Sequence, residues 1–200
     1  MKIAIQIIFL VFLISCKRNL DKENTFYDFV YKTKKIDTIE YRKEKPFVFI
    51  KTGKFLSNQT TNGLLIKNIK DSTYTIELYT LTVKGWLKND NLNFTSKYML
   101  QFYTEYKDYD FDGQKDIYIQ STASNGYSLS RGNLIMINRQ TKKLFWVKEA
   151  KNLANMSPDE NLKAIISESV DWCPDLKVCK WINKWKNGKL VTIKKDCPCK

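Results

Sequence analysis

Apolar and polar residues alternate in short runs along most of this chain, which is the period of half-buried β-strands and not of helices. The alternation is longest over residues 73–83 (TYTIELYTLTV) and 92–106. Shorter runs rich in β-branched and aromatic residues occupy positions 47–50, 64–69, 117–120, 134–138, 143–147, 164–167, 178–185 and 190–194. Many short strands with turn signals between them predict an all-β domain with little helix, whose antiparallel sheets form a sandwich, a barrel or a small propeller-like stack.

Turn residues separate these runs. Asn187-Gly188 lies between the last two runs and has the composition of a type I′ hairpin turn. Residues 139–142 give a second hairpin signal between the runs 134–138 and 143–147. A helix start is indicated only at residues 157–160 (SPDE), where proline would occupy the first helical position. We therefore expect only one helix start after residue 26, at residues 157–160.

The first sixteen residues follow a different pattern. Lys2 gives a positive start, and residues 3–14 are apolar except for Gln6. An apolar run of about twelve residues suits the core of a signal peptide, whereas a membrane-spanning helix needs roughly twenty. The sequence LISC that ends at Cys16 resembles the lipobox of bacterial lipoproteins, in which a signal peptidase cuts before the cysteine and lipids are attached to it. A short helix docked on the core, or an uncleaved anchor, is the alternative interpretation.

This N-terminal pattern predicts the organisation of the whole chain. We expect a signal peptide at residues 1–15, a lipidated Cys16 with a polar tether up to residue 25, and a single β domain over residues 26–200. Acyl chains such as palmitate would hold the mature protein on a membrane. The expected location is therefore the cell envelope of a bacterium, on the outer membrane or its periplasmic face.

The chain is basic, with 34 Lys and Arg against 21 Asp and Glu and a net charge of +13. Nucleic acid is not an expected partner, because no helix-turn-helix, zinc-finger or base-stacking motif accompanies the charge. A basic protein held on a membrane suits contact with anionic lipid or a polyanionic envelope, or with an acidic protein partner. The lysines are scattered, which is also the pattern of an ordinary solvated surface.

Four cysteines other than Cys16 lie near the C-terminus: Cys173, Cys179, Cys197 and Cys199. Their spacings do not match the paired cysteines of zinc sites, and an oxidising compartment favours two structural disulfides. Pairing Cys197 with Cys199 across one residue would be strained. The remaining alternatives are Cys173–Cys197 with Cys179–Cys199, and Cys173–Cys199 with Cys179–Cys197. Either would fasten the C-terminal tail to an upstream hairpin.

Residues 108–116 (DYDFDGQKD) contain the strongest chemical motif, with the pattern D-x-D-x-D-G-x-x-D. Alternate side chains can converge on one cation, and the glycine permits a sharp turn. Carboxylates this close would repel one another without a counter-ion, and hard oxygen ligands favour Ca²⁺ over zinc or copper. The alternative is a solvated acidic turn in which Asp side chains cap backbone groups. The predicted calcium ligands are the side chains of Asp108, Asp110, Asp112 and Asp116 and the backbone carbonyl of Gln114.

The motif departs from an EF-hand at its end. Ile119 stands where a bidentate Glu would close the site, and the flanking residues alternate as strands instead of forming helices. The loop is closer to the calcium loops between strands in FG-GAP and integrin-type repeats. Residues 98–195 contain this loop, the hairpin after it and the sequence WINKWKNGKLVTIKK, and they resemble small bacterial envelope lipoproteins with one FG-GAP-like Asp-rich loop.

That resemblance implies a calcium-containing, β-propeller-like domain, with Asp108, Asp110, Asp112 and Asp116 as ligands by position. Some proteins of this kind act as periplasmic inhibitors or immunity proteins against lysozyme-type cell-wall hydrolases. The resemblance implies the same class of partner here. No inhibitory residue carries over, because no inhibitor motif matches, and the C-terminal cysteines depart from the simple pattern.

Catalysis is not expected. The chain has no His, which removes Ser-His, Cys-His and imidazole–metal mechanisms, and the acidic cluster is better explained by a cation than by a sugar-cleaving carboxylate pair. We expect a non-enzymatic binding module with a structural Ca²⁺, whose partner is a cell-wall hydrolase or toxin. The alternative is a glycan- or surface-polymer-binding lipoprotein that uses its basic charge and aromatic residues, including Trp181 and Trp185 on one strand face.

Overall fold

The computed structural model describes residues 25–33, 38–96, 99, 102–122 and 129–198. The chain forms two compact units, Met1–Lys35 and Ile36–Lys200. In the first unit, helix α2 (Thr25–Thr33) occupies residues where we expected the end of a tether and then strands. Its Phe26, Phe29 and Val30 have the i, i+3, i+4 spacing of an amphipathic helix, which outweighs the strand propensity of the aromatic residues. None of the described helices has the length and apolar character needed to cross a membrane.

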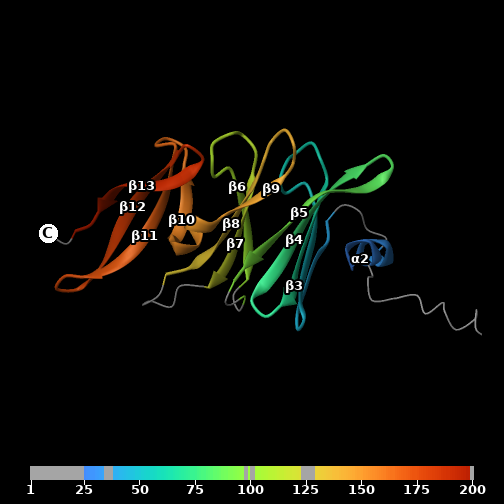
Figure 1. Ribbon diagram of the computed structural model, residues 1–200, viewed down its shortest axis with the longest axis horizontal. Helices are drawn as coiled ribbons and strands as arrows, with labels where there is room; N and C mark the ends of the chain where they lie inside the picture. Colours follow the sequence, from blue (N-terminus) through green and yellow to red (C-terminus); the bar gives the residue numbers. More distant parts are fainter. Residues whose placement is uncertain (1–24, 34–37, 97–98, 100–101, 123–128, 199–200) are drawn as a thin grey trace, which may run out of the picture. The chain divides into compact units, whose positions relative to one another are not determined.

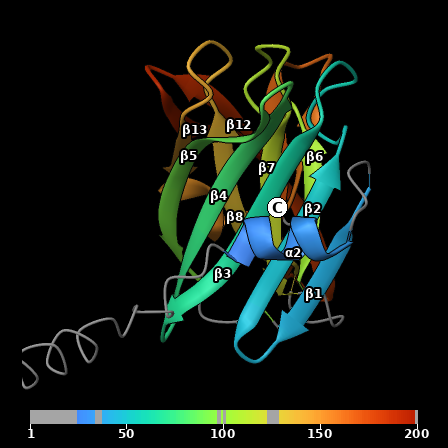
Figure 2. The same ribbon diagram turned by 90° about the vertical axis from the view of Figure 1, so that its right-hand side faces the viewer.

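The second unit is all-β, as predicted, and contains two antiparallel sheets. The first sheet is a five-stranded meander in which each strand pairs with the next along the chain. Figure 2 shows its strands side by side. They are β1 (Glu40–Glu44), β2 (Phe47–Gly53), β3 (Asn62–Lys70), β4 (Thr73–Thr82) and β5 (Gly85–Thr95).

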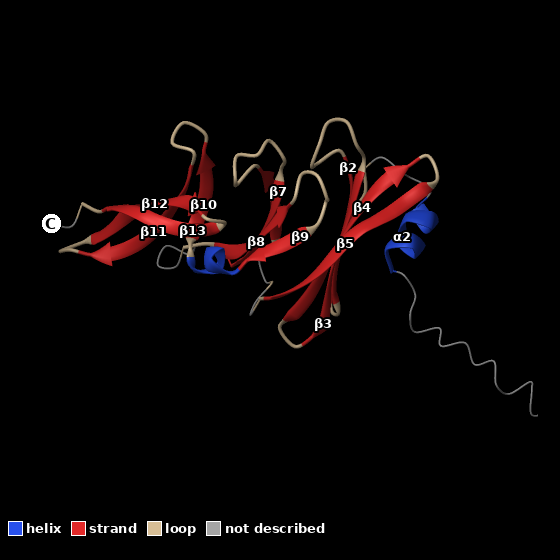
Figure 3. Ribbon diagram, turned by 45° about the horizontal axis from the view of Figure 1, so that its top comes forward, coloured by secondary structure: helices blue, strands red, loops and turns tan. Residues whose placement is uncertain are grey.

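The second sheet has eight strands in the order β13-β12-β11-β10-β8-β7-β6, with β9 also paired to β8. One register pair, Ala154 with Arg131, joins β10 to β8. The sheet therefore has two parts, β6–β9 and β10–β13, which are separate groups of strands in Figures 1 and 3. Its elements are β6 (Tyr103–Lys107), β7 (Asp116–Thr122), β8 (Arg131–Ile137), β9 (Leu144–Val147), the 3-10 helix η1 (Lys148–Asn152), β10 (Ala154–Asp159), β11 (Ala164–Trp172), β12 (Leu176–Lys186) and β13 (Lys189–Asp196).

Strands β7 and β8 form a middle layer that is buried on both faces. Ile117 and Ile119 of β7 join a core that also contains β2, β3 and β4 side chains of the first sheet. Tyr118, on the opposite face of the same strand, joins a second core with Met156 and Ile165 of β10 and β11. Successive residues of a strand point to opposite faces, so an uninterrupted apolar run is what a strand between two cores requires.

Two expectations from the sequence are wrong. The alternating run 92–106 is divided between β5 and β6, which belong to different sheets. The segment 157–160 is not a helix start: Pro158 pairs with Ile165 in the β10–β11 ladder, and the Asp159 carboxylate then accepts the backbone N–H groups of Asn161 and Leu162. Asp capping of this kind forms a turn as readily as a helix N-terminus, and no apolar helical period follows to favour the helix.

The predicted hairpin at Asn187-Gly188 is confirmed. It joins β12 to β13, and both residues have positive φ, 50° and 73°, as a type I′ turn requires. The signal at residues 139–142 is also a turn, in which the Asn138 side chain accepts the N–H groups of Gln140 and Thr141. Local turn chemistry therefore determines both hairpins.

The C-terminal strand is covalently fastened to its neighbour. Cys179 of β12 forms a disulfide with Cys197, just after β13, as one of the two predicted connectivities requires. Cys173 is also disulfide-bonded, and Cys199 lies outside the described residues. Closing a loop of this size removes about 3 kcal/mol of chain entropy from the unfolded state. The disulfide therefore holds β13 against β12 near the end of the chain.

The close approach of β7 and β8 can be tested at Gly132. A Cβ there would lie 2.2 Å from the Ile119 carbonyl oxygen, so Gly132→Ala forces the two strands apart. We expect a loss of about 1–3 kcal/mol in the free energy of unfolding, measured by denaturant titration. The control Val83→Ala, at a fully exposed position, should change it by less than about 0.5 kcal/mol. Equal stability of both variants would contradict the tight packing of the middle layer.

Candidate metal centre

The Asp loop, residues 108–115, connects β6 to β7, and Asp116 is the first residue of β7. The flanking segments are strands, as the sequence predicted. In Figure 1 the loop lies at the same end of the β unit as the β8–β9 turn and the β2–β3 connection. The loop is therefore placed by the middle layer, the most buried part of the unit.

Hydrogen bonds within the Asp loop bend it around its first carboxylate. The Asp108 carboxylate accepts the backbone N–H of Gly113 at 2.7 Å and that of Asp112 at 3.2 Å. Phe111 and Gly113 have left-handed backbones, with φ of 65° and 85°. Glycine adopts this conformation at little cost, whereas Phe111 does so against its preference, and the loop hydrogen bonds offset that cost. The loop thus turns back on itself.

Three of the four predicted carboxylate ligands converge. Asp108, Asp110 and Asp116 each offer an oxygen, and these oxygens lie within 4.8 Å of one another. Calcium–oxygen distances are about 2.3–2.6 Å, so two ligand oxygens on opposite sides of one ion lie about 5 Å apart at most. The carboxylate set therefore fits a single Ca²⁺ in both chemistry and size.

The other two predicted ligands are placed differently. The Asp112 carboxylate is outside the converging group, and its Oδ1 accepts the backbone N–H of Gln114 at 2.6 Å. The Gln114 side chain accepts a hydrogen bond from Lys142 Nζ at 2.9 Å. The role of the Gln114 carbonyl as a ligand stays a prediction. Asp112 shapes the turn in the way that the acidic-turn alternative describes.

Asp116 is the most buried of the acidic residues in the loop, at 1% exposure. One of its carboxylate oxygens accepts the N–H of Tyr109 at 3.0 Å and the other accepts the N–H of Ile137 at 2.9 Å. Asp116 therefore ties the start of the loop to the end of β8.

Burial raises the pKa of two of the three carboxylates. Desolvation raises the pKa of Asp116 to about 8, although its two backbone hydrogen bonds oppose the shift. Desolvation, and next the negative charge of Asp112, raise the pKa of Asp110 to about 6. Among the ion pairs of the described residues, none joins a lysine or arginine to Asp108, Asp110 or Asp116. A divalent cation would supply the missing positive charge.

A distant tryptophan also holds the Asp loop. Trp185 of β12 donates its indole N–H to the Tyr109 carbonyl at 2.8 Å and packs in the second core. Arg139 donates to the Asp112 carbonyl at 2.9 Å from the β8–β9 turn. No sequence pattern predicts the Trp185 contact, because 76 residues separate the two partners. Backbone contacts from two other parts of the unit therefore fix the loop.

Trp181 and Trp185 share a strand face with the buried Asn183, and both are half-buried. Asn183, between them, is 1% exposed and hydrogen-bonds Ser167 and Thr192. Trp181 donates its indole N–H to Ser169 at 2.7 Å, and Lys195 lies over its ring. Both indole N–H groups of Trp181 and Trp185 are thus used inside the protein.

A second cluster of possible ligands contains Asp171, Cys179 and Cys197. The two cysteines are joined in a disulfide, so neither sulfur is a thiolate that could bind a metal. The predicted lipidation site, Cys16, lies outside the described residues. Within the described residues, the Asp loop is therefore the candidate metal centre.

Comparison with protein-family models, curated proteins and solved structures gives no match to this chain.

The raised carboxyl pKa values predict how stability depends on pH when calcium is chelated. In the unfolded chain an Asp titrates near pH 3.9, whereas Asp110 and Asp116 titrate at about 6 and 8 in the folded protein. The folded state then retains protons that the unfolded state has released, so this stabilisation is complete below about pH 4 and is lost as the pH rises through 6 and 8. The melting temperature in chelator should fall between pH 5 and pH 8.5.

Asp116→Asn should flatten this pH dependence, whatever its effect on absolute stability. The chain contains no His, so no imidazole titrates in the same window. Thermal melts of both proteins at a series of pH values, with chelator present, make the comparison. An unchanged slope in the Asn variant would assign the pH dependence to other groups.

Trp185→Phe tests the anchoring of the Asp loop. The substitution keeps an aromatic ring in the core and removes the hydrogen bond to the Tyr109 carbonyl, which should cost about 0.5–1.5 kcal/mol of stability and weaken calcium binding several-fold. Trp181→Phe removes the bond to Ser169 and is the matched control, with calcium affinity unchanged. Calorimetric titration with Ca²⁺ measures both, and equal affinities would show that Trp185 does not support the loop.

Proposed function

We propose that this protein is a calcium-stabilised, non-enzymatic binding module of the bacterial cell envelope. The observation that carries the proposal is the convergence of the Asp108, Asp110 and Asp116 carboxylates in a loop that the core holds in place. A bound Ca²⁺ would neutralise these charges and fix the loop. The role of the metal is then structural, because the bound ion makes the loop and the surface around it rigid.

The donor set supports calcium over transition metals. The converging atoms are carboxylate oxygens, which are hard ligands, and the chain has no His to offer a softer nitrogen. The same lack of His supports a non-enzymatic role, because the commonest general base and nucleophile activator is missing.

The proposed location depends on the N-terminal pattern and is consistent with the disulfide chemistry. The apolar residues 3–14 and the LISC sequence support export and lipid attachment at Cys16. Disulfides such as Cys179–Cys197 persist in oxidising compartments outside the cytoplasm. The β unit would therefore act at the envelope surface, held by its lipid.

Calcium-dependent melting of the unlipidated protein tests the metal centre. A ligand that binds only the folded state stabilises it by about 2.7 kcal/mol at a hundredfold excess over Kd, and extracellular calcium modules bind with Kd values of about 10⁻⁴–10⁻³ M. Millimolar Ca²⁺ should therefore raise the melting temperature of the native protein. Asp110→Asn should abolish the rise.

Two further variants make the test specific. Asp175→Asn, at an exposed turn, should keep the full calcium response. Asp112→Asn should keep most of it, because this carboxylate is outside the converging group. If the native protein has the same melting temperature in calcium and in chelator, the loop is an ordinary acidic turn and the proposal is overturned.

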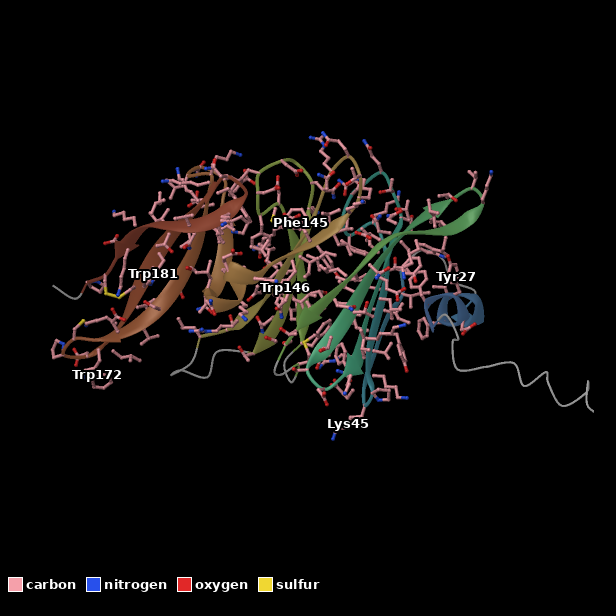
Figure 4. The ribbon with its side chains drawn as sticks, in the orientation of Figure 1. Tyr27, Lys45, Phe145, Trp146, Trp172 and Trp181 are labelled. Atoms are coloured by element: carbon pink, nitrogen blue, oxygen red, sulfur yellow. A yellow bond between two sulfur atoms is a disulfide. The ribbon has the colours of Figure 1, made fainter. Side chains whose placement is uncertain are left out.

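A second candidate function is inhibition of, or immunity to, a cell-wall hydrolase or toxin. It is favoured by an apolar strip at the β11–β12 hairpin, in which three large side chains are between 43% and 75% exposed. Cross-strand pairing places Trp172 opposite Leu176, and Trp172 lies at the end of the β11–β12 hairpin in Figure 4. An exposed apolar patch of this kind commonly marks a protein-binding surface. The strip consists of Trp172, Leu176 and Val178.

The inhibitor candidate predicts a stable 1:1 complex with a lysozyme-type hydrolase and loss of the hydrolase activity. Trp172→Ser should weaken that complex at least about tenfold, because large aromatic side chains dominate interface energetics. Phe145→Ser is the matched control, since Phe145 is an exposed aromatic on β9, away from the strip (Figure 4). Size-exclusion chromatography and a cell-wall lysis assay across a panel of such hydrolases measure both. No complex with any of them would remove this candidate.

A further inference from the structure

A cleft of about 740 Å³ lies beside the Asp loop. Its walls come from the end of the first sheet, the β2–β3 connection, residues Gly113 to Lys115 of the loop and the β8–β9 turn. Figure 1 shows these segments at one end of the β unit. The volume is in the range of pockets that bind small molecules or short polymer segments.

The inner face of the first sheet changes from apolar to polar side chains where it reaches the cleft. Leu64 and Leu78 belong to the first core. Two residues further along the same faces stand Asn62 and Thr80, which pair across β3 and β4 and line the cleft. Because side chains two apart on a strand share a face, the apolar core continues directly into a polar surface.

Asn62 carries an unused hydrogen-bond acceptor just below this surface. Its side chain is 6% exposed, and its Oδ1 has no hydrogen-bond partner. Its Nδ2 is 3.5 Å from Thr80 Oγ1, which also accepts a 2.7 Å hydrogen bond from Asn89 Nδ2. Leaving a buried acceptor unpaired costs about 1–3 kcal/mol, so a ligand that donates a hydrogen bond would favour a rotation of the Asn62 side chain that brings this oxygen to the cleft.

The opposite wall is basic. Lys115, Arg139 and Lys142 line the cleft, and its described lining contains no Asp or Glu. Lys142 is oriented by Gln114 and Arg139 by the Asp112 carbonyl, both neutral acceptors in the Asp loop. None of the three cations is in an ion pair among the described residues. This wall can therefore receive an anion.

We propose that this cleft binds an acidic carbohydrate, a sugar chain that carries carboxylate groups. Ring hydroxyls would exchange hydrogen bonds with the amide and hydroxyl side chains of the lining, while the carboxylates would meet the basic wall. Leu87, which is 57% exposed, gives an apolar surface for the C–H face of a sugar ring. The cleft is lined by the first sheet, the Asp loop and the β8–β9 turn, whereas the apolar strip lies at the β11–β12 hairpin, so the two sites are distinct.

The inference deepens the proposed binding role and connects it to the metal. Gly113, Gln114 and Lys115 lie between the candidate ligands Asp110 and Asp116 and form part of the cleft wall. Calcium that fixes the loop would also fix this wall, and by linkage the carbohydrate would tighten calcium binding by the same factor.

The test uses a hyaluronan tetrasaccharide, which alternates glucuronate with N-acetylglucosamine, and calorimetric titration of the calcium-loaded, unlipidated protein. Tetra-N-acetylchitotetraose is the neutral carbohydrate control and tetraglutamate is the acidic peptide control. We expect saturable binding of the hyaluronan fragment, with both controls at least about tenfold weaker, as expected for loss of one charge-assisted contact. Tetraglutamate binding of equal strength would overturn the assignment to carbohydrate.

Matched variants test whether the hyaluronan fragment binds in the cleft. Lys142→Gln, at the surface of the turn, and Asn62→Ala should each weaken hyaluronan binding about fivefold to tenfold. Lys186→Gln, an exposed lysine at the end of β12, should leave it unchanged. If Asn62→Ala does not fold, Lys142→Gln alone decides, and native affinity in that variant overturns the proposal.

Calcium-dependent melting of the same samples reports the proposed function separately. A normal calcium response without hyaluronan binding overturns the cleft inference and leaves the metal centre intact. Hyaluronan binding without a calcium response overturns the metal centre and leaves the cleft.

Discussion

β7 and β8 bury side chains on both of their faces, and the rest of the β unit is arranged around that constraint. Ile117 and Ile119 pack toward the first sheet, while Tyr118 packs toward β10–β13. Each large side chain buried in this way contributes about 1.5–3 kcal/mol. A layer with no solvent face can carry polar chemistry only at the ends of its strands. The Asp loop and the cleft both lie at such an end.

Asp116 stands at the boundary between the core and the loop. It is the first residue of β7, its carboxylate is buried, and its hydrogen bonds to Tyr109 and Ile137 join two segments that would otherwise separate. A neutral side chain with one acceptor oxygen would satisfy only one of these N–H groups. The buried Asp116 carboxylate therefore stabilises the loop through its hydrogen bonds, while its negative charge is removed from water at a cost in free energy. A bound cation would offset that cost.

Local patterns predicted much of the fold. Strand period, turn chemistry and ligand spacing are short-range properties that a few neighbouring residues determine. They predicted the apolar runs of β7 and β8, the Asn187-Gly188 turn and the spacing of Asp108, Asp110 and Asp116. The sequence could not predict that residues 92–106 are divided between two sheets. Two separate strands show the same alternation of apolar and polar residues as one long strand. Residues 157–160 were mistaken for a helix start because Asp capping serves turns as well.

The long-range features of the candidate site were also outside the reach of the sequence. The bond from Trp185 to the Tyr109 carbonyl depends on β12 packing against the middle layer. The unpaired oxygen of Asn62 is apparent only once β3 and β4 are placed opposite the β8–β9 turn. Such contacts follow from tertiary packing, which one sequence without aligned relatives does not reveal.

The order of strands has a consequence for how the chain reaches this structure. Among the described strands, every pairing except that of β8 with β10 joins consecutive strands. Partners that are close in sequence lose little entropy when they meet, so this β protein has few of the long loop closures that slow the folding of sandwiches and barrels. A chain delivered from its N-terminus, as a translocated protein is, can complete each hairpin in turn as the next strand arrives. The one non-consecutive pairing, Ala154 with Arg131, then needs to join only two finished parts.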